Sequence, residues 1–143
     1  MRDTQVIKII DHVTNTIGKE FTWGDNDCTM FAFDVADILV GSGLRKKFQK
    51  KWKDAPSAHR YSKKNKLTVE KVLKANGAKP AKNNFEQFAD FIIMNRAMSN
   101  SKKWRTVGVY VGDGKVALMT EENGLLLVRL DIIKKYKVLR IPA

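Results

Sequence analysis

The spacing of apolar residues changes partway along this chain of 143 residues, and this change is what most limits the folds open to it. In the N-terminal half, apolar residues mostly recur three or four positions apart, which is the spacing of amphipathic helices. From about residue 91 they form short runs separated by turns rich in Gly, Asp and Asn, a pattern typical of antiparallel strands. Helices followed by hairpin-linked strands predict an α+β fold in a single domain over residues 1–143.

Turn and capping residues set the expected limits of these elements. The first helix is expected over about 4–17, and the second begins near its candidate N-caps, Asn26 or Asp27. Residues 45–66 show no clear periodicity, and a short helix is expected over about 67–75. The expected strands form an antiparallel meander and cover residues 91–94, 106–111, 115–119, 125–128 and 138–141.

Positive charge is concentrated in the middle of the chain. Residues 45–82 hold 14 Lys and Arg against two acidic residues, whereas the other 105 residues hold 13 of each and are neutral overall. The chain therefore resembles a neutral domain with a basic helical or loop insertion, and its net charge of +12 points to a polyanionic partner. The candidate anion-binding residues are Arg45, Lys46, Lys47, Lys50, Lys51, Lys53, Arg60, Lys63 and Lys64.

Two interpretations of this basic segment are open. Phe48, Trp52 and Tyr61 lie among the cations, so the aromatic rings could stack on bases while the cations contact phosphates. Alternatively, the lysines only keep a solvated helix and loop soluble, and the aromatic rings point inward.

The single cysteine, Cys28, is the one residue with evident nucleophilic chemistry. One Cys excludes an intramolecular disulfide, and the chain shows no ligand spacing for zinc, so neither a metal nor a cofactor is expected. At the start of the second helix, free N–H groups and the helix dipole would favour a thiolate and lower the thiol pKa. Nearby acidic residues would oppose that ionisation. The alternative is that Cys28 packs beside Phe31 as a small apolar residue.

The residues around Cys28 resemble a known motif, and the pattern is formed by Trp23, Gly24, Asp27, Cys28, Phe31 and Asp34. It resembles the nucleophile motif of the NlpC-type, papain-fold cysteine peptidases, which cut peptide bridges in bacterial cell walls. The resemblance is strongest to a short phage-encoded branch of that superfamily with no settled function. It implies a papain-like (NlpC-type) domain in which N-terminal helices pack on a C-terminal antiparallel sheet, with Cys28 as the candidate nucleophile.

Later segments extend the resemblance over nearly the whole chain. Ala89-Asp90 and the apolar residues after it resemble the Gly-Asp strand of the family. Residues 107–115, with Gly108 and Gly112, resemble its His-Val-Gly-Ile-Tyr-x-Gly-x-Gly hairpin, and residues 140–142 match the end of the phage branch.

The chain departs from the family at the catalytic base. In active members a His opens the hairpin and takes the thiol proton, but Thr106 stands at that position, and a Thr hydroxyl cannot be that base. On the next strand, where the third triad residue usually lies, only Thr120 offers a polar group. His12 is expected at the surface or boundary of the first helix, which leaves His59, in the basic segment, as the one candidate base.

Three functions are open at this point. The first is a phage virion or tail-associated protein with the NlpC-type fold that is catalytically degenerate and acts at the cell wall or in particle assembly. The second is an active murein endopeptidase that takes its base from elsewhere. The third is a non-catalytic nucleic-acid-binding or packaging module that uses residues 45–82.

These functions imply different partners. Other phage structural proteins or peptidoglycan would suit the first two, and nucleic acid or another anionic polymer would suit the basic segment. No apolar run exceeds four residues, so neither a signal peptide nor a membrane span is expected. The resemblance places the protein in the bacterial host cytoplasm during synthesis and then in the virion.

Overall fold

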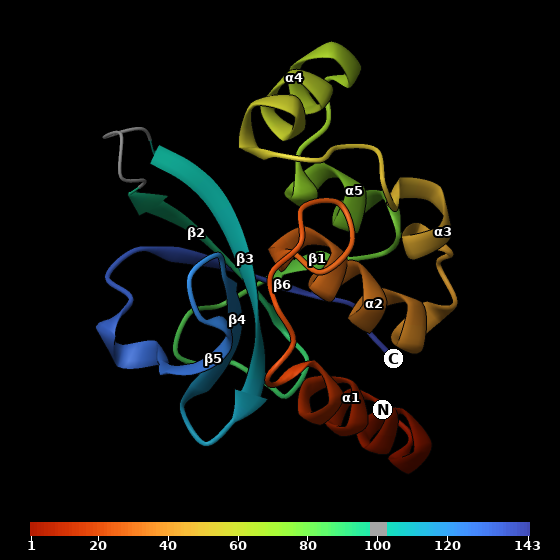
Figure 1. Cartoon of the computed structure of the whole chain (residues 1–143). Helices are drawn as coiled ribbons and strands as arrows, with labels where there is room; N and C mark the ends of the chain where they lie inside the picture. Colours follow the sequence, from red (N-terminus) through yellow and green to blue (C-terminus); the bar gives the residue numbers. More distant parts are fainter. Residues whose placement is uncertain (98–102) are drawn as a thin grey trace.

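In the part of the chain that the structure describes, five helices and a six-stranded antiparallel sheet form an α+β fold (Figure 1). The computed structural model describes the backbone of residues 1–97 and 103–143 and the side chains of residues 1–95 and 106–143. The helices are α1 (Asp3–Thr16), α2 (Cys28–Val40), α3 (Leu44–Phe48), α4 (Ala55–Asn65) and α5 (Val69–Ala75). The strands are β1 (Lys79–Ala81), β2 (Phe91–Ala97), β3 (Lys103–Gly112), β4 (Lys115–Thr120), β5 (Gly124–Arg129) and β6 (Tyr136–Arg140), and a 3-10 helix, η1 (Leu130–Ile132), precedes β6.

The strand order corrects the expected meander. Strands β2 to β5 do follow one another across the sheet, but the full order is β1-β6-β2-β3-β4-β5. After η1, the chain returns so that β6 pairs with β2, and β1 then pairs with β6 at the edge. The sequence of β1, Lys79-Pro80-Ala81, has no alternation of apolar residues, and its Pro is tolerated because the strand lies at an edge. Neither the return of β6 to β2 nor the strand β1 can therefore be predicted from the local sequence pattern alone.

Each face of the sheet has its own apolar cluster. On one face, α2 packs against β3 and β4 with side chains such as Phe31, Val35 and Val109. The opposite face is covered by the chain around η1 and β6, and its buried residues are Ile92, Met94, Val116, Leu118 and Val138. Helix α2 is therefore the central helix of the larger cluster, and its N-terminal end is held against the sheet.

The basic segment is more helical than its sequence pattern indicates. It contains α3 and α4, which lie with α5 on one side of the molecule (Figure 1). Helix α4 begins with a capping box, in which the Asp54 carboxylate accepts from the Ser57 N–H and the Ser57 hydroxyl oxygen accepts from the Asp54 N–H. This helix is marked by its N-terminal capping box and not by a stripe of apolar residues. The spacing of apolar residues therefore does not predict it. Within the described ranges, no helix is long and apolar enough to cross a membrane.

Candidate functional site

The turn that leads into α2 is organised by the buried carboxylate of Asp27. As the N-cap of α2, Asp27 accepts from the Met30 N–H at 2.8 Å. Its other oxygen accepts from the Gly24 N–H at 2.8 Å and from the Trp52 indole N–H at 2.7 Å. Three donors thus compensate the desolvation of a carboxylate that is only 1% exposed. Of the two N-caps that the sequence allowed, the structure uses Asp27.

Gly24 is required by the backbone that crosses this turn. Its φ is +79°, and a Cβ at this position would lie 2.1 Å from the Trp52 carbonyl oxygen. The Gly24 carbonyl also accepts from the Lys50 N–H at 2.8 Å. Trp23 packs edge-on against Phe21, with the ring centroids 4.9 Å apart. Gly24 and Asp27 therefore join the turn to the basic segment, whereas Trp23 packs within the turn itself.

The structure brings Cys28 and Thr106 together. Cys28 is the first residue of α2 and packs, half-buried, against the larger apolar cluster. The thiol contacts the Thr106 side chain and the Val107 backbone of β3, and its Sγ lies 4.0 Å from the Thr29 hydroxyl oxygen. The two positions at which the resembled motif has its nucleophile and its base are therefore in contact.

The local environment of Cys28 favours the protonated thiol over the thiolate. Burial is the largest effect and raises the pKa of Cys28, and the negative charge of Asp27 raises it further. Hydrogen bonds with Thr106, Val107 and Thr29 lower the pKa but do not reverse the net upward shift. The expectation that the start of α2 lowers the thiol pKa is therefore wrong, because burial and the charge of Asp27 raise the pKa more than the hydrogen bonds lower it.

The two histidines lie on different elements. His59 is exposed on α4. His12 of α1 is half-buried and stacks on the Phe31 ring at 4.5 Å, with its Nε2 3.4 Å from the Phe31 carbonyl oxygen. Burial lowers the pKa of His12, mainly because a charged imidazole would be poorly solvated there. His12 is thus the boundary residue that the sequence predicts.

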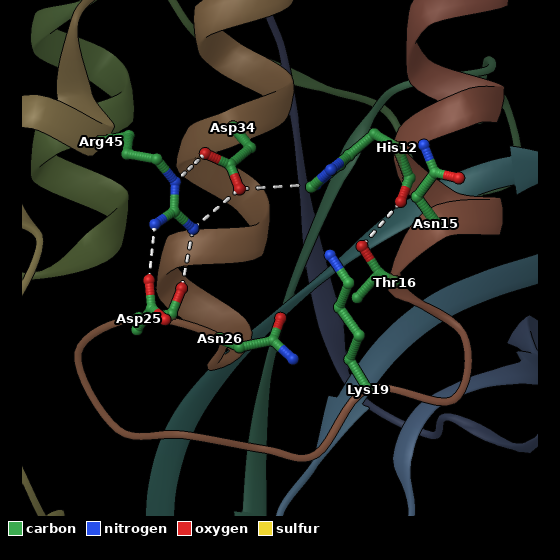
Figure 2. Close-up of a pocket in the computed structure, with 8 residues that line it drawn as sticks. All are labelled: His12, Asn15, Thr16, Lys19, Asp25, Asn26, Asp34 and Arg45. Carbon is green, nitrogen blue, oxygen red and sulfur yellow. Dashed lines mark hydrogen bonds and ion pairs between the residues drawn. The ribbon is translucent and has the colours of Figure 1, made fainter.

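A polar pocket of about 400 Å³ lies between α1, α2 and the turn (Figure 2). Arg45 lines this pocket. Two of its N–H groups donate to the Asp34 carboxylate, and the longer of these hydrogen bonds is 2.9 Å. The same guanidinium donates to the Asp25 carboxylate at 3.0 Å and to the Asp25 carbonyl oxygen at 2.7 Å. Lys19 points into the same hollow from the loop after α1 (Figure 2).

Arg45 therefore differs from the other candidate anion-binding residues, because it already binds two carboxylates of the chain. Asp34, a residue of the resembled motif, ties α2 to the start of α3 through this ion pair. Sequence reasoning missed this cluster. The opposite charges of Arg45, Asp25 and Asp34 are visible in the sequence, but nothing local indicates that they meet.

The strand motifs of the resemblance also have structural roles. The carboxylate of Asp90, 1% exposed, accepts two N–H bonds from Arg140, at 2.8 Å and 2.7 Å, so two separate motifs meet. Ala89 has a φ of +72°, which favours the Gly that the resembled motif carries there. A Cβ on Gly108 would lie 2.5 Å from a Val116 methyl group, and Gly112 uses a φ of +89° to end β3.

Among the described residues, no three or more His, Cys, Asp or Glu side chains are grouped so that they could hold a metal ion. The described part of the chain also has no buried side-chain N or O atom without a hydrogen-bond partner. The buried polar side chains of this site are thus hydrogen-bonded within the protein.

The fold and the site together define an α+β domain in which a cysteine at a helix start faces a Thr on an antiparallel sheet. Comparison with known families matches residues 2–138 to a family described as a domain of unknown function (DUF6950), and the chain belongs to that family. Comparison with the curated proteins finds no match.

Proposed function

We propose that the protein is a phage virion or tail-associated protein with an NlpC-type cysteine-peptidase fold that is catalytically degenerate and acts at the bacterial cell wall or in particle assembly. The observation that carries this proposal is the contact between Cys28 and Thr106. This contact supports the matching of Cys28 and Thr106 to the nucleophile and base positions of the NlpC-type peptidases, because those two positions must lie close together in space.

The chemistry of this pair supports the degenerate state. A cysteine peptidase needs a thiolate and a base that accepts the thiol proton, and the Thr106 hydroxyl cannot accept it near neutral pH. Burial and Asp27 both raise the pKa of Cys28, which further lowers the fraction of thiolate. Loss of one triad member typically lowers the rate by a factor on the order of 10⁴.

The first experiment measures the rate at which Cys28 reacts with iodoacetamide across a pH series. The wild type is expected to react only in the alkaline range, above the reference thiol pKa of about 8.5. Thr106→His places an imidazole beside the thiol. This variant should therefore also react with iodoacetamide near neutral pH. Thr106→Asn is the matched control because it adds comparable bulk without a base, and circular dichroism checks that both variants fold.

The second experiment incubates the wild type with purified peptidoglycan and measures released amino groups. We expect no release above the level of Cys28→Ala. Release by the wild type that Cys28→Ala abolishes would overturn the proposal and favour an active murein endopeptidase. In that case, His59→Ala would test whether His59 is the base.

A further inference from the structure

The basic segment presents exposed cations that the site around Cys28 does not use. Apart from Arg45, all the candidate anion-binding residues are exposed. We define the basic face as these exposed residues of α3, α4 and the loop between them: Lys46, Lys47, Lys50, Lys51, Lys53, Arg60, Lys63 and Lys64.

Acidic residues of the same segment are engaged in other contacts. The Asp54 carboxylate caps α4 and accepts from the Ser57 N–H at 2.8 Å. Glu70 of α5 is bound by Lys74 at 3.0 Å and by Lys137 of β6 at 3.7 Å. The exposed cations of the basic face therefore outnumber the acidic residues of the segment and leave it strongly positive.

The aromatic residues of this segment point inward, so they are not placed to stack on bases. Phe48 and Trp52 are buried, and Tyr61 is half-buried between them. The Tyr61 ring lies 6.4 Å from the Phe48 ring and 5.5 Å from the Trp52 ring, and the Trp52 indole N–H is bound to Asp27. These rings hold α4 to the body of the protein and are not available to stack on bases.

Helix α4 is a peripheral element with cations on its outer side. It has no buried residue, and in Figure 1 it lies at the top of the view, above α5. Lys63 and Lys64 follow Arg60 by three and four positions, so all three lie on the same side of the helix. Eleven residues make a rod of about 16 Å, which offers these charges in a fixed arrangement.

We propose that the basic face binds double-stranded nucleic acid through its phosphates, without reading base sequence. The inward rings remove the stacking platform that single-strand binding uses. A rigid duplex, with a persistence length of about 50 nm, loses little conformational freedom on binding a preformed surface, whereas a flexible anionic polymer would lose more. This binding does not depend on Cys28.

The test measures fluorescence anisotropy of two unrelated 24-base-pair DNA duplexes with the full-length chain between 50 and 200 mM salt. We expect similar affinity for both duplexes and a logarithm of affinity that falls linearly with the logarithm of salt. Replacing Arg60, Lys63 and Lys64 together with Gln should weaken binding at least about tenfold at low salt and reduce the slope by about two to three.

A matched variant removes the same charge elsewhere. Lys8 lies on α1, and Lys134 and Lys135 lie between η1 and β6, in the region that covers the opposite face of the sheet. Replacing Lys8, Lys134 and Lys135 with Gln should change affinity less than twofold. Equal loss in both triple variants would overturn the proposal, because it would show a response to net charge alone.

Two further results would also overturn the proposal. One is the absence of binding at 50 mM salt, and the other is tighter binding to single-stranded DNA or to poly(glycerol phosphate) than to duplex DNA at equal phosphate concentration. Cys28→Ala should bind duplex DNA as the wild type does. If duplex DNA does not bind, the proposal about Cys28 and Thr106 is therefore unaffected.

Discussion

The turn that leads into α2 and helix α4 are joined through Trp52, yet they are built in opposite ways. In the turn, a buried carboxylate accepts three N–H groups, and Gly24 leaves no room for a side chain. Helix α4 has no buried residue, and its outer face carries exposed cations. The turn therefore contributes stability, whereas α4 contributes surface charge and little to the core.

The largest expected effect comes from Gly24→Ala. The new methyl group would overlap the Trp52 carbonyl oxygen at 2.1 Å, and the φ of +79° is strained for Ala. We expect the free energy of unfolding to fall by about 3–4 kcal/mol in urea denaturation.

Gly18→Ala is the matched control for this variant. Gly18 has a φ of +86° but nothing within 4 Å of its Cβ position, so Ala should cost only about 1–2 kcal/mol there. Equal losses for the two variants would show that backbone strain alone, and not the close approach of Trp52, makes Gly24 necessary.

Asp27→Asn tests the buried carboxylate itself. The amide nitrogen of Asn cannot accept a hydrogen bond, so one side of the new side chain would meet N–H donors without an acceptor. We expect a loss of about 2–3 kcal/mol in the free energy of unfolding.

Asp25→Asn in the same turn is its control. The Asp25 side chain is 56% exposed and pairs with Arg45 at the surface, so its replacement should cost less than about 1 kcal/mol. If Asp27→Asn cost no more than Asp25→Asn, the turn would not depend on the buried carboxylate.

A smaller effect is expected from pH through His12, which packs on the first half of α2. Burial lowers the pKa of the folded-state imidazole, and Arg45 and Lys19 act in the same direction, whereas Asp34 opposes them. The unfolded chain therefore binds a proton more readily than the folded protein, and stability falls as pH drops below about 6.5.

Urea unfolding at pH 7.5 and pH 5.5 measures this effect. The wild type should lose stability between these two values, and His12→Gln should lose less. An equal loss in both proteins would show that other groups carry the pH dependence.

The smallest effect concerns the end of α4. Lys66 adopts a φ of +51° as the C-cap, a conformation that Gly adopts without strain. Lys66→Gly should therefore raise the free energy of unfolding by about 0.5–1 kcal/mol. Lys64→Gly, within the helix, should lower it by a similar amount, about 0.5–1 kcal/mol. Destabilisation by Lys66→Gly would contradict this account of how α4 ends.

Local sequence signals account for much of the helical half and for the hairpins. Asp27 is a candidate N-cap because carboxylates accept N–H bonds at helix starts, and α2 begins directly after it. The strands from β2 to β5 followed from short apolar runs and Gly-containing turns. These features depend on neighbouring residues, so they are visible before the fold is known.

Long-range contacts decided the rest, because their partners lie far apart in the sequence. The pairing of β6 with β2, the contact of Cys28 with Thr106 and the ion pair of Arg45 with Asp34 each join separate segments. The direction of the thiol pKa shift also depends on the fold, since burial, which sequence position does not reveal, is its largest cause. Local sequence thus specifies which charged and capping residues the protein has, whereas contacts between distant segments set which of them are buried, paired or exposed.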